Sequence, residues 1–365
     1  MKKIRLVELF SGIGAQAKAL EKLNIDFEVV GYSEIDKFAI KSYEAIHGEQ
    51  PALGDIEKIE VLPECDILTY SSPCQDFSIG GTKLGLVDEQ GNKTRSGLLL
   101  DVERLLDKAK ADGKLPRILL MENVKNLVGK QFKPCFDKWL EKLDELGYNN
   151  YWKVLNAKDY GIPQNRERVF VISILKEHDH DGYTFPEPFE LETRLKDLLE
   201  DEVPESYYLE QKTIDKIVNS KFHSERDRIM KGDVCYTLRA RDYKDPICVK
   251  EEPKVMQVAN YLEGEGNYWK NPNNGRIYSG DGLAPTLNCM EGGNRQPKVW
   301  LDGEQVRVRK LTERECWRLM GFSDEDVDKV KAVGISKSQM YKQAGNSIVV
   351  DVLYHIFSRL NLSND

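Results

Sequence analysis

Apolar segments of strand length alternate with amphipathic segments over the first 175 residues, and this alternation constrains the fold more than any other feature. The apolar runs occupy residues 3–10, 27–34, 65–71, 117–124 and 168–175. Apolar residues recur at helical spacing in residues 11–23, 36–48 and 136–148. Strands that alternate with helices indicate a mostly parallel sheet covered on both faces, so we predict an α/β fold.

The texture of the chain changes after residue 186. Residues 220–305 are rich in Gly, Asn, Pro and aromatic residues and show no long helical period. Helical character returns at residues 311–322. Residues 346–362 are amphipathic, and Asn346 or Ser347 is expected to cap this last helix. We therefore predict two domains, with these bounds: a first domain over 1–186, completed by 335–365, and an irregular or β-rich domain with its hinge over 187–334.

Bulk composition excludes several classes of protein. No run approaches the eighteen or so apolar residues of a membrane span, and the apolar run after Met1 is too short for a signal peptide, so we expect a cytoplasmic protein. The seven cysteines form no CxxC pair, which predicts reduced thiols and no metal site. The net charge is −8, yet residues 221–310 carry sixteen Lys/Arg against thirteen Asp/Glu. A local basic face is therefore compatible with the acidic total.

A glycine-rich turn joins the first predicted strand to the first predicted helix. Gly12, Gly14 and Ala17 fit the pattern G-x-G-x-x-A, in which small residues let the backbone approach a ligand. Glu34 ends the next strand, where its carboxylate can accept hydrogen bonds from ribose hydroxyls. This pair predicts a nucleotide-like cofactor and leaves NAD and S-adenosylmethionine open, and a tight turn without a ligand is the alternative.

Three further motifs carry reactive side chains. In SSPCQDFS, residues 71–78, Cys74 follows a proline in a serine-rich turn, and a thiol attacks only as a thiolate. Glu122 ends an apolar strand, where partial desolvation raises the pKa of a carboxyl group. Arg166 and Arg168 alternate before another strand, so both guanidinium groups can face one site. Taken singly, these residues are also compatible with a buried thiol, a helix cap and surface arginines.

The order of the motifs is more specific than any one of them. The chain resembles the cytosine-5 DNA methyltransferase family in six stretches: ELFSGIGA, SSPCQDFS, LLMENVKNL, QNRERVFVIS, RKLTERECWRLMGF and YKQAGNSIVVDVL. The resemblance implies a Rossmann-like S-adenosylmethionine-dependent methyltransferase domain with a smaller, irregular or β-rich target recognition domain. Outside these motifs, residues 187–305 match the family only in general character.

The resemblance also implies a binding site for S-adenosylmethionine. Glu34 would bind the ribose, Asp55 the adenine amino group, and the glycine turn the methionine part. Ile35 stands where the family usually has an aromatic residue. The full set of implied cofactor residues is Phe10, Gly12, Ile13, Gly14, Glu34, Ile35, Asp55, Ile56, Pro73, Asn346 and Ser347.

The family's chemistry assigns catalytic roles to four residues. The Cys74 thiolate would add to C6 of a flipped-out cytosine, and Glu122 would bind N3 and the exocyclic amine. Arg168 would contact the carbonyl oxygen of the base, and Arg166 is placed beside it. The addition makes C5 nucleophilic enough to accept a methyl group, after which the C5 proton leaves and the thiolate departs.

The predicted substrate is double-stranded DNA, bound by a monomer without metal or membrane. Residues 76–97 contain five glycines and are expected to form a lid that contacts phosphate. Base-reading loops are expected in the second domain. The predicted DNA-contacting residues are Ser78, Lys93, Arg95, Arg239, Arg241, Lys244, Arg276 and Arg295.

Three alternatives share part of this pattern. A nicotinamide oxidoreductase shares the glycine turn but needs neither Cys74 nor Glu122. A tRNA cytosine-5 methyltransferase of the same family would share nearly all the motifs, although the long segment 220–305 suits a reader of DNA sequence. A catalytically silent binding protein would not need all of the reactive residues. The recognition sequence depends on loop shapes that these motifs do not specify.

Overall fold

The computed structural model describes residues 3–72, 96–208 and 308–362, together with 229–230, 235–236, 248–250, 257–260, 276–279 and 298–300. The chain divides into two compact units. The first comprises Met1–Leu199, Asp233–Lys244 and Glu313–Asp365, and the second comprises Glu200–Gly232 and Asp245–Thr312.

A six-stranded sheet forms the centre of the first unit, in the order β2-β1-β3-β4-β7-β5. Neighbouring strands from β2 to β4 run parallel, whereas β7 is antiparallel to both β4 and β5. The prediction of a mostly parallel sheet is therefore confirmed, with one reversed strand. The strands are β1 (Ile4–Leu9), β2 (Phe27–Ser33), β3 (Ile67–Tyr70), β4 (Ile118–Val124), β5 (Tyr148–Asn156) and β7 (Glu167–Leu175).

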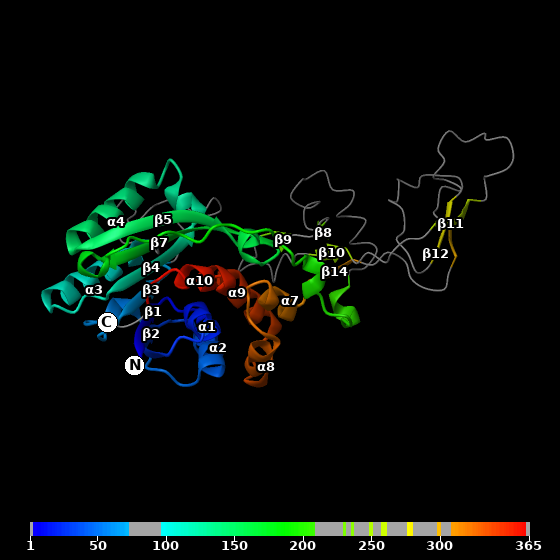
Figure 1. Ribbon diagram of the computed structural model, residues 1–365. Helices are drawn as coiled ribbons and strands as arrows, with labels where there is room; N and C mark the ends of the chain where they lie inside the picture. The colour runs from blue at the N-terminus through cyan, green and yellow to red at the C-terminus, as the bar shows by residue number, and fades with distance from the viewer. Residues whose placement is uncertain are drawn as a thin grey trace. The chain divides into compact units, whose positions relative to one another are not determined.

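Helices cover both faces of this sheet (Figure 1). The longer α-helices of the N-terminal half are α1 (Ala15–Lys22), α2 (Lys37–His47), α3 (Leu99–Ala111) and α4 (Lys133–Leu146). The C-terminal segment adds α7 (Glu313–Arg318), α8 (Asp324–Ala332), α9 (Lys337–Asn346) and α10 (Val350–Phe357). Short 3-10 helices occupy Ile56–Lys58, Ser96–Leu98, Lys125–Val128, Ala157–Tyr160, Lys176–His178, Leu195–Leu198 and Glu205–Tyr207.

Side-chain alternation along the strands gives the sheet two different faces. Val7 and Leu9 of β1 belong to one apolar cluster with Leu105 of α3 and Trp139 of α4. Glu8 points to the opposite face, where it bonds to α1 and α2. Because successive strand residues alternate between faces, β1 carries a fully apolar core on one side and a buried carboxylate on the other.

Sequence analysis did not predict strand β5 or helices α3, α8 and α9 of the first unit. Strand β5 mixes Asn and Lys with aromatic residues, so its sequence lacks the apolar run of a central strand. Its Trp152 side chain is 41% exposed. Strand β5 is the last strand in the order of the sheet, so among the described residues it pairs with a strand, β7, on one side only. Helix α3 follows the glycine-rich segment and was not predicted, although Val102, Leu105 and Leu106 of its buried face follow helical spacing.

The C-terminal segment corrects one predicted cap and one predicted boundary. Ser347 follows the end of α9 instead of beginning the last helix, and α10 starts after Val349. Of the predicted second domain, residues 187–199 and 233–244 belong to the first unit, and so do residues 313–334. The physical reason is packing, since Trp317 is fully buried and donates from Nε1 to the Met340 carbonyl of α9 at 3.0 Å.

The described residues of the second unit include short strands and the 3-10 helix Glu205–Tyr207. One three-stranded sheet has the order β14-β10-β8 and another the order β11-β12-β13. A two-stranded pair, β6 with β9, belongs to the first unit. The bounds are β6 (Gln164–Asn165), β8 (Ile229–Met230), β9 (Cys235–Tyr236), β10 (Cys248–Lys250), β11 (Gln257–Asn260), β12 (Arg276–Ser279), β13 (Lys298–Trp300) and β14 (Val308–Lys310). Within the described ranges, no helix has the length and apolar character needed to span a membrane.

Candidate active site

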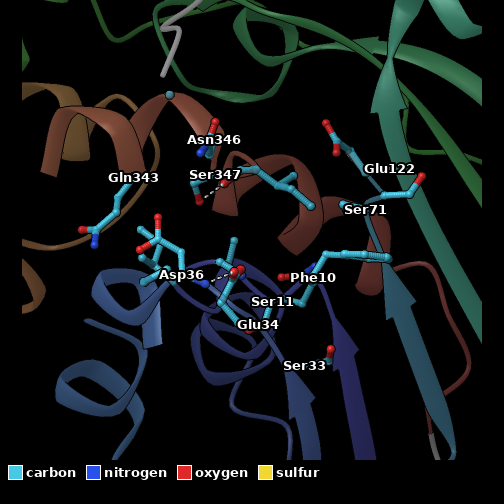
Figure 2. Close-up of a pocket in the computed structure, with 18 of the residues that line it drawn as sticks. Phe10, Ser11, Ser33, Glu34, Asp36, Ser71, Glu122, Gln343, Asn346 and Ser347 are labelled. Carbon is cyan, nitrogen blue, oxygen red and sulfur yellow. Dashed lines mark hydrogen bonds between the residues drawn. The ribbon is translucent and has the colours of Figure 1, made fainter. Parts of the chain in front are cut away.

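A cavity of about 340 Å³ opens at the carboxyl ends of β1 to β4 in the first unit. Its wall takes residues from the glycine turn after β1, from the ends of β2, β3 and β4, and from the end of α9. Figure 2 shows Glu34 and Asp36 on one side of this cavity and Glu122 on another. The carboxyl edge of a parallel sheet is where ligands bind in open α/β folds.

The glycine turn has a constrained backbone. Phe10, Gly12 and Gly14 all have positive φ, at 57°, 57° and 78°. Positive φ is rare for a residue with a side chain, so Phe10 stores local strain at the cavity wall. The Ser11 amide donates to the Ser33 carbonyl at 3.0 Å, which ties the turn to the end of β2.

The two glycines of the turn have different surroundings. An added Cβ at Gly12 would meet no atom within 4 Å, and Gly12 lines the cavity. An added Cβ at Gly14 would overlap the side chains of His47 and Tyr43. Gly12 therefore leaves room for a ligand, whereas Gly14 lets the turn pack on α2. The structure places the predicted cofactor residue Gly14 beneath the cavity instead of in its wall.

Glu34 organises the backbone at the end of β2. Its Oε2 accepts from the Gly12 amide at 3.0 Å, and its Oε1 accepts from the amides of Ile35 and Asp36 at 2.8 and 2.9 Å. Three backbone donors thus hold this carboxylate beside the turn, and it keeps contact with the cavity. Ile35 also lines the cavity and is 73% exposed.

Asp55 and Ile56 extend the same side of the cavity. Asp55 caps a 3-10 helix by accepting from the Glu57 amide at 3.1 Å, and Ile56 is buried. Together with Phe10, Gly12, Ile13, Glu34 and Ile35, they bring the cofactor residues that were predicted from the N-terminal 60 residues to one cavity, with Gly14 as the exception.

Glu122 and Arg168 form an ion pair on the other side. The Arg168 Nε lies 3.1 Å from Glu122 Oε1, and both side chains line the cavity. Burial raises the pKa of Glu122, and the charges of Arg168 and Arg166 oppose that rise. The Glu122 carboxyl is therefore protonated at a higher pH than an ordinary glutamate, close to an open cavity.

Arg166 is bound to the C-terminal segment. Its Nη2 donates to the Gly345 carbonyl at 3.1 Å and to the Ser347 carbonyl at 2.7 Å, and the residue is 4% exposed. Both arginines predicted to face one site do line the cavity, but they bind different partners. Asn346, between the two carbonyls, is exposed at the cavity wall.

Sequence analysis missed several residues that shape the cavity. The Asn123 Nδ2 donates to the Ser72 carbonyl at 3.3 Å, which fixes the chain two residues before Cys74. Lys342 of α9 pairs with Asp36 at 2.5 Å, and both line the cavity. Asn123 stands next to Glu122 in the quoted motif, so its position was available as a signal. The pairing of Lys342 with Asp36 joins residues some 300 positions apart and had no local signal.

Several predicted site residues lie outside the described ranges. One predicted DNA-contacting residue, Arg276, belongs to strand β12 of the second unit. In the described part of the chain, no group of three or more His, Cys, Asp or Glu side chains could hold a metal ion. The residues outside the description are Pro73, Cys74, Ser78, Lys93, Arg95, Arg239, Arg241, Lys244 and Arg295.

Comparison with known proteins identifies the family. Residues 4–361 match the family described as C-5 cytosine-specific DNA methylase. The type II methyltransferase M2.ScrFI of Lactococcus lactis subsp. cremoris is 35% identical over 412 residues, which covers 98% of this chain and 99% of the relative. The type II methyltransferase M.HhaI of Haemophilus parahaemolyticus is 34% identical, with coverage of 98% and 95%.

Further matches come from a phage and from a solved structure. The orphan methyltransferase M.SPBetaI of Bacillus phage SPbeta is 31% identical, with coverage of 99% of this chain and 98% of the relative. The crystal structure of the S. pombe Dnmt2 methyltransferase has the same fold, with a TM-score of 0.62, 21% identity and coverage of 98% and 97%. The chain therefore belongs to the C-5 cytosine-specific DNA methylase family. It is an enzyme of the DNA (cytosine-5)-methyltransferase class.

Proposed function

We propose that this chain, acting as a monomer, transfers a methyl group from S-adenosylmethionine to C5 of a cytosine flipped out of double-stranded DNA. One observation carries the proposal: a single cavity is lined on one side by the glycine turn with Glu34 and Asp55, and on another by Glu122 and Arg168. A methyl donor and an acceptor base must meet in one site, and this cavity has residues suited to each.

The residues of the first side fit S-adenosylmethionine. The hydroxyls of Ser11 and Ser72 are buried at the cavity without a hydrogen-bond partner among the described residues, so a polar ligand would satisfy them. Glu34 would accept from ribose hydroxyls and Asp55 from the adenine amino group, while the open side of Gly12 leaves room for the ligand. S-adenosylmethionine supplies an electrophilic methyl group on a sulfonium sulfur.

Asn346 and Ser347 would complete this side from the end of α9, since both line the cavity. Pro73, which precedes Cys74 in the sequence, would also contribute. Arg166 would act as a positioning residue for the α9 end, because its guanidinium binds the carbonyls on either side of Asn346. This assignment replaces the catalytic role predicted for Arg166.

Glu122 and Arg168 would recognise the base. A protonated Glu122 can donate to N3 of cytosine, and its other oxygen can accept from the exocyclic amine. The raised pKa of Glu122 keeps that proton available at higher pH than for an ordinary carboxyl group. Arg168 lies beside Glu122 and would donate to the carbonyl oxygen of the base.

Cys74 would perform the covalent step. Its thiolate would form a bond to C6, the ring electrons would move towards C5 and N3, and N3 would take up the proton from Glu122. C5 would then take the methyl group and displace S-adenosylhomocysteine as the bond between sulfonium sulfur and methyl breaks. A base would remove the C5 proton, the bond between the Cys74 sulfur and C6 would break, and N3 would return its proton to Glu122. The hydrogen bond from Asn123 to Ser72 supports this role, because it anchors the chain just before Cys74.

The predicted reader of the DNA sequence, residues 187–334, would be narrowed to 200–312, because 187–199 and 313–334 belong to the first unit. Within 200–312, residues 233–244 also belong to the first unit and would contribute Arg239, Arg241 and Lys244. Arg239, Arg241, Lys244, Arg276 and Arg295 are the proposed base or phosphate contacts, and Ser78, Lys93 and Arg95 would contact DNA from the proposed lid. Replacing 200–312 by the matching segment of a relative with another target should change the methylated sequence. An unchanged methylated site in the chimera, mapped by bisulfite sequencing, would contradict this role.

The decisive experiment follows transfer of a labelled methyl group from S-adenosylmethionine to double-stranded DNA and, separately, to tRNA. We expect label in DNA, at C5 of cytosine, and none after Cys74→Ala. DNA containing 5-fluorocytosine should form an adduct that survives denaturation, because fluorine cannot leave C5 as a proton. Label in tRNA alone would identify the tRNA-directed alternative, and substantial turnover by Cys74→Ala would disprove the covalent mechanism.

A further inference from the structure

Glu8, Tyr43 and His47 form a polar group beneath the glycine turn, here called the support cluster, in which Glu8 and Tyr43 are buried and His47 is half-buried. Glu8 lies in β1 and Tyr43 in α2, both without exposed surface. His47 lies one turn after Tyr43, with ring centroids 4.8 Å apart. None of the three lines the cavity, so the proposed chemistry gives them no role.

Glu8 acts as a remote cap for helix α1. Gly14, the N-cap residue of α1, has no side chain that could accept a hydrogen bond. Glu8 Oε1 accepts instead from the Ala17 amide in the first turn of α1 at 3.1 Å. Its Oε2 accepts a short hydrogen bond from the Tyr43 hydroxyl. One carboxylate thus joins β1, the start of α1 and α2, and satisfies a helix amide that would otherwise lack an acceptor.

His47 holds the turn itself. Its Nε2 lies 3.2 Å from the Ile13 carbonyl, and a carbonyl only accepts, so this nitrogen carries the hydrogen and donates. Ile13 lines the cavity. The absence of a side chain at Gly14 allows the turn to lie against both Tyr43 and His47. The support cluster therefore contacts the turn on the side away from the cavity.

We propose that Glu8, Tyr43 and His47 are positioning residues of the cofactor site, which hold the glycine turn in the conformation that binds S-adenosylmethionine. The proposal rests on the proposed function and deepens it. Phe10, Gly12 and Gly14 hold positive φ, and a turn of this kind keeps one conformation only when its surroundings impose it. The support cluster contacts the turn and the start of α1 on the side away from the cavity and so restricts their conformation.

The charge of Glu8 makes this support sensitive to pH. Burial raises the pKa of Glu8 to about 7, and the bonds from Tyr43 and Ala17 limit that rise. The ionised carboxylate accepts both bonds, whereas the protonated acid has a hydrogen of its own that needs an acceptor. The turn should therefore be held more firmly at pH 8 than at pH 6.

Other titratable groups surround the cluster. Tyr32 of β2 stacks on Tyr43 with centroids 4.3 Å apart. Lys18 of α1 pairs with Asp326 of α8 at 2.9 Å and with Glu21 at 3.3 Å, near His47. Burial lowers the pKa of His47, so the pKa of its ring lies below that of Glu8. Removal of the Glu8 charge alone should therefore abolish the dependence on pH.

A matched pair of tyrosine variants tests the support without any ligand. Tyr43→Phe removes the hydroxyl bound to Glu8, and Tyr32→Phe removes a hydroxyl that donates to Glu44 at 3.2 Å. In the full chain without cofactor, amide hydrogen exchange over residues 10–17 should be about tenfold faster in Tyr43→Phe, since a buried bond to a carboxylate is lost. Tyr32→Phe should change it by less than about twofold. Equal exchange in both variants would overturn the proposal.

Calorimetry with S-adenosylmethionine gives the functional readout. Tyr43→Phe should weaken binding about tenfold while kcat at saturating cofactor is retained, because only the turn is affected. Glu8→Gln should remove the change in affinity between pH 6 and pH 8 that the wild type shows. His47→Leu should weaken binding, and His47→Gln should restore part of it, because a glutamine amide can donate to Ile13. A wild type that binds no cofactor would disprove the proposed function. Wild-type affinity in Tyr43→Phe and His47→Leu, together with an unchanged pH dependence in Glu8→Gln, would disprove the positioning role of the support cluster.

Discussion

The two sides of the cavity are held by different kinds of interaction. On the cofactor side, Glu34 is fixed by three backbone amides and stays in contact with the cavity opening. On the base side, Glu122 is buried and paired with Arg168. The first arrangement supplies fixed acceptors at little electrostatic cost, whereas the second keeps charged groups in a poorly solvated place.

This difference has a consequence for how each side responds to mutation. A change on the cofactor side removes hydrogen bonds and should mainly alter affinity for the cofactor. A change on the base side alters the protonation of groups that contact the reacting ring, and should mainly alter the rate of the chemical step. Single substitutions on each side can separate effects on cofactor affinity from effects on the chemical rate.

The largest effect is expected from Glu122→Gln. This variant keeps the shape of the side chain but cannot deliver a proton to the base, so kcat should fall by about 10²- to 10⁴-fold. Affinity for S-adenosylmethionine should stay within about twofold, because the cofactor residues are unchanged. Single-turnover methylation and calorimetry measure the two quantities. A large loss of cofactor affinity with little change in rate would break the division between the two sides.

Glu34→Ala should show the opposite pattern. The loss of the acceptor for the ribose hydroxyls costs about 1 to 3 kcal/mol, which corresponds to roughly ten- to hundredfold weaker cofactor binding. The rate at saturating cofactor should change much less. Asp55→Ala is the companion variant on the same side, and unchanged affinity in both would place the cofactor elsewhere.

Arg166→Met should lower stability more than it changes either affinity or rate. Two buried carbonyls, those of Gly345 and Ser347, lose their donor, and each unsatisfied group costs about 1 to 3 kcal/mol. Urea unfolding measures the change in the free energy of unfolding. Arg168→Met is the control: because its partner Glu122 contacts the reacting base, this variant should change the rate more than the stability. A larger rate defect in Arg166→Met than in Arg168→Met would reverse the assigned roles.

The pH dependence of stability should reveal the contribution of the Glu122 carboxyl, one of two buried carboxyl groups with a raised pKa among the described residues. Because burial raises the pKa of Glu122 in the folded state, the folded protein holds this proton more tightly than the unfolded chain does. Its contribution to stability is present at low pH and is lost as the pH rises above the ordinary carboxyl pKa, with a slope of at most about 1.4 kcal/mol per pH unit. Chemical unfolding from pH 5 to 8 should therefore show a shallower decline in Glu122→Gln than in the wild type. The same slope in both would show that Glu122 is ionised throughout.

The smallest effect is expected from Glu167→Gln, one residue before Arg168. Glu167 pairs with Lys125 at 2.8 Å, and the two side chains are 44% and 56% exposed. Exposed pairs of this kind contribute about 0 to 1 kcal/mol. Stability, cofactor affinity and rate should all remain near wild type in the assays above. A strong rate defect would mean that the base side extends to the exposed face of β7.

Sequence patterns predicted most of the first unit because they report local physics. Apolar runs such as RILLMENV and RVFVISIL become central strands β4 and β7, since burial on both faces requires uninterrupted apolar residues. The glycine turn, Glu34 and Glu122 were also predicted from their places at strand ends, which meet at one edge of the sheet. Edge strand β5 was missed because a half-exposed strand tolerates polar residues.

Tertiary structure alone decided which long-range partners the site residues have. Arg166 and Arg168 look alike in QNRERV, yet one binds the carbonyls of Gly345 and Ser347 and the other pairs with Glu122. The sequence placed Glu8 in a predicted strand and in the motif ELFSGIGA. It did not indicate that the Glu8 carboxylate accepts hydrogen bonds from the Ala17 amide of α1 and the Tyr43 hydroxyl of α2. Periodicity specifies which face of an element is buried, but the partner of a buried polar group is chosen by how distant elements pack.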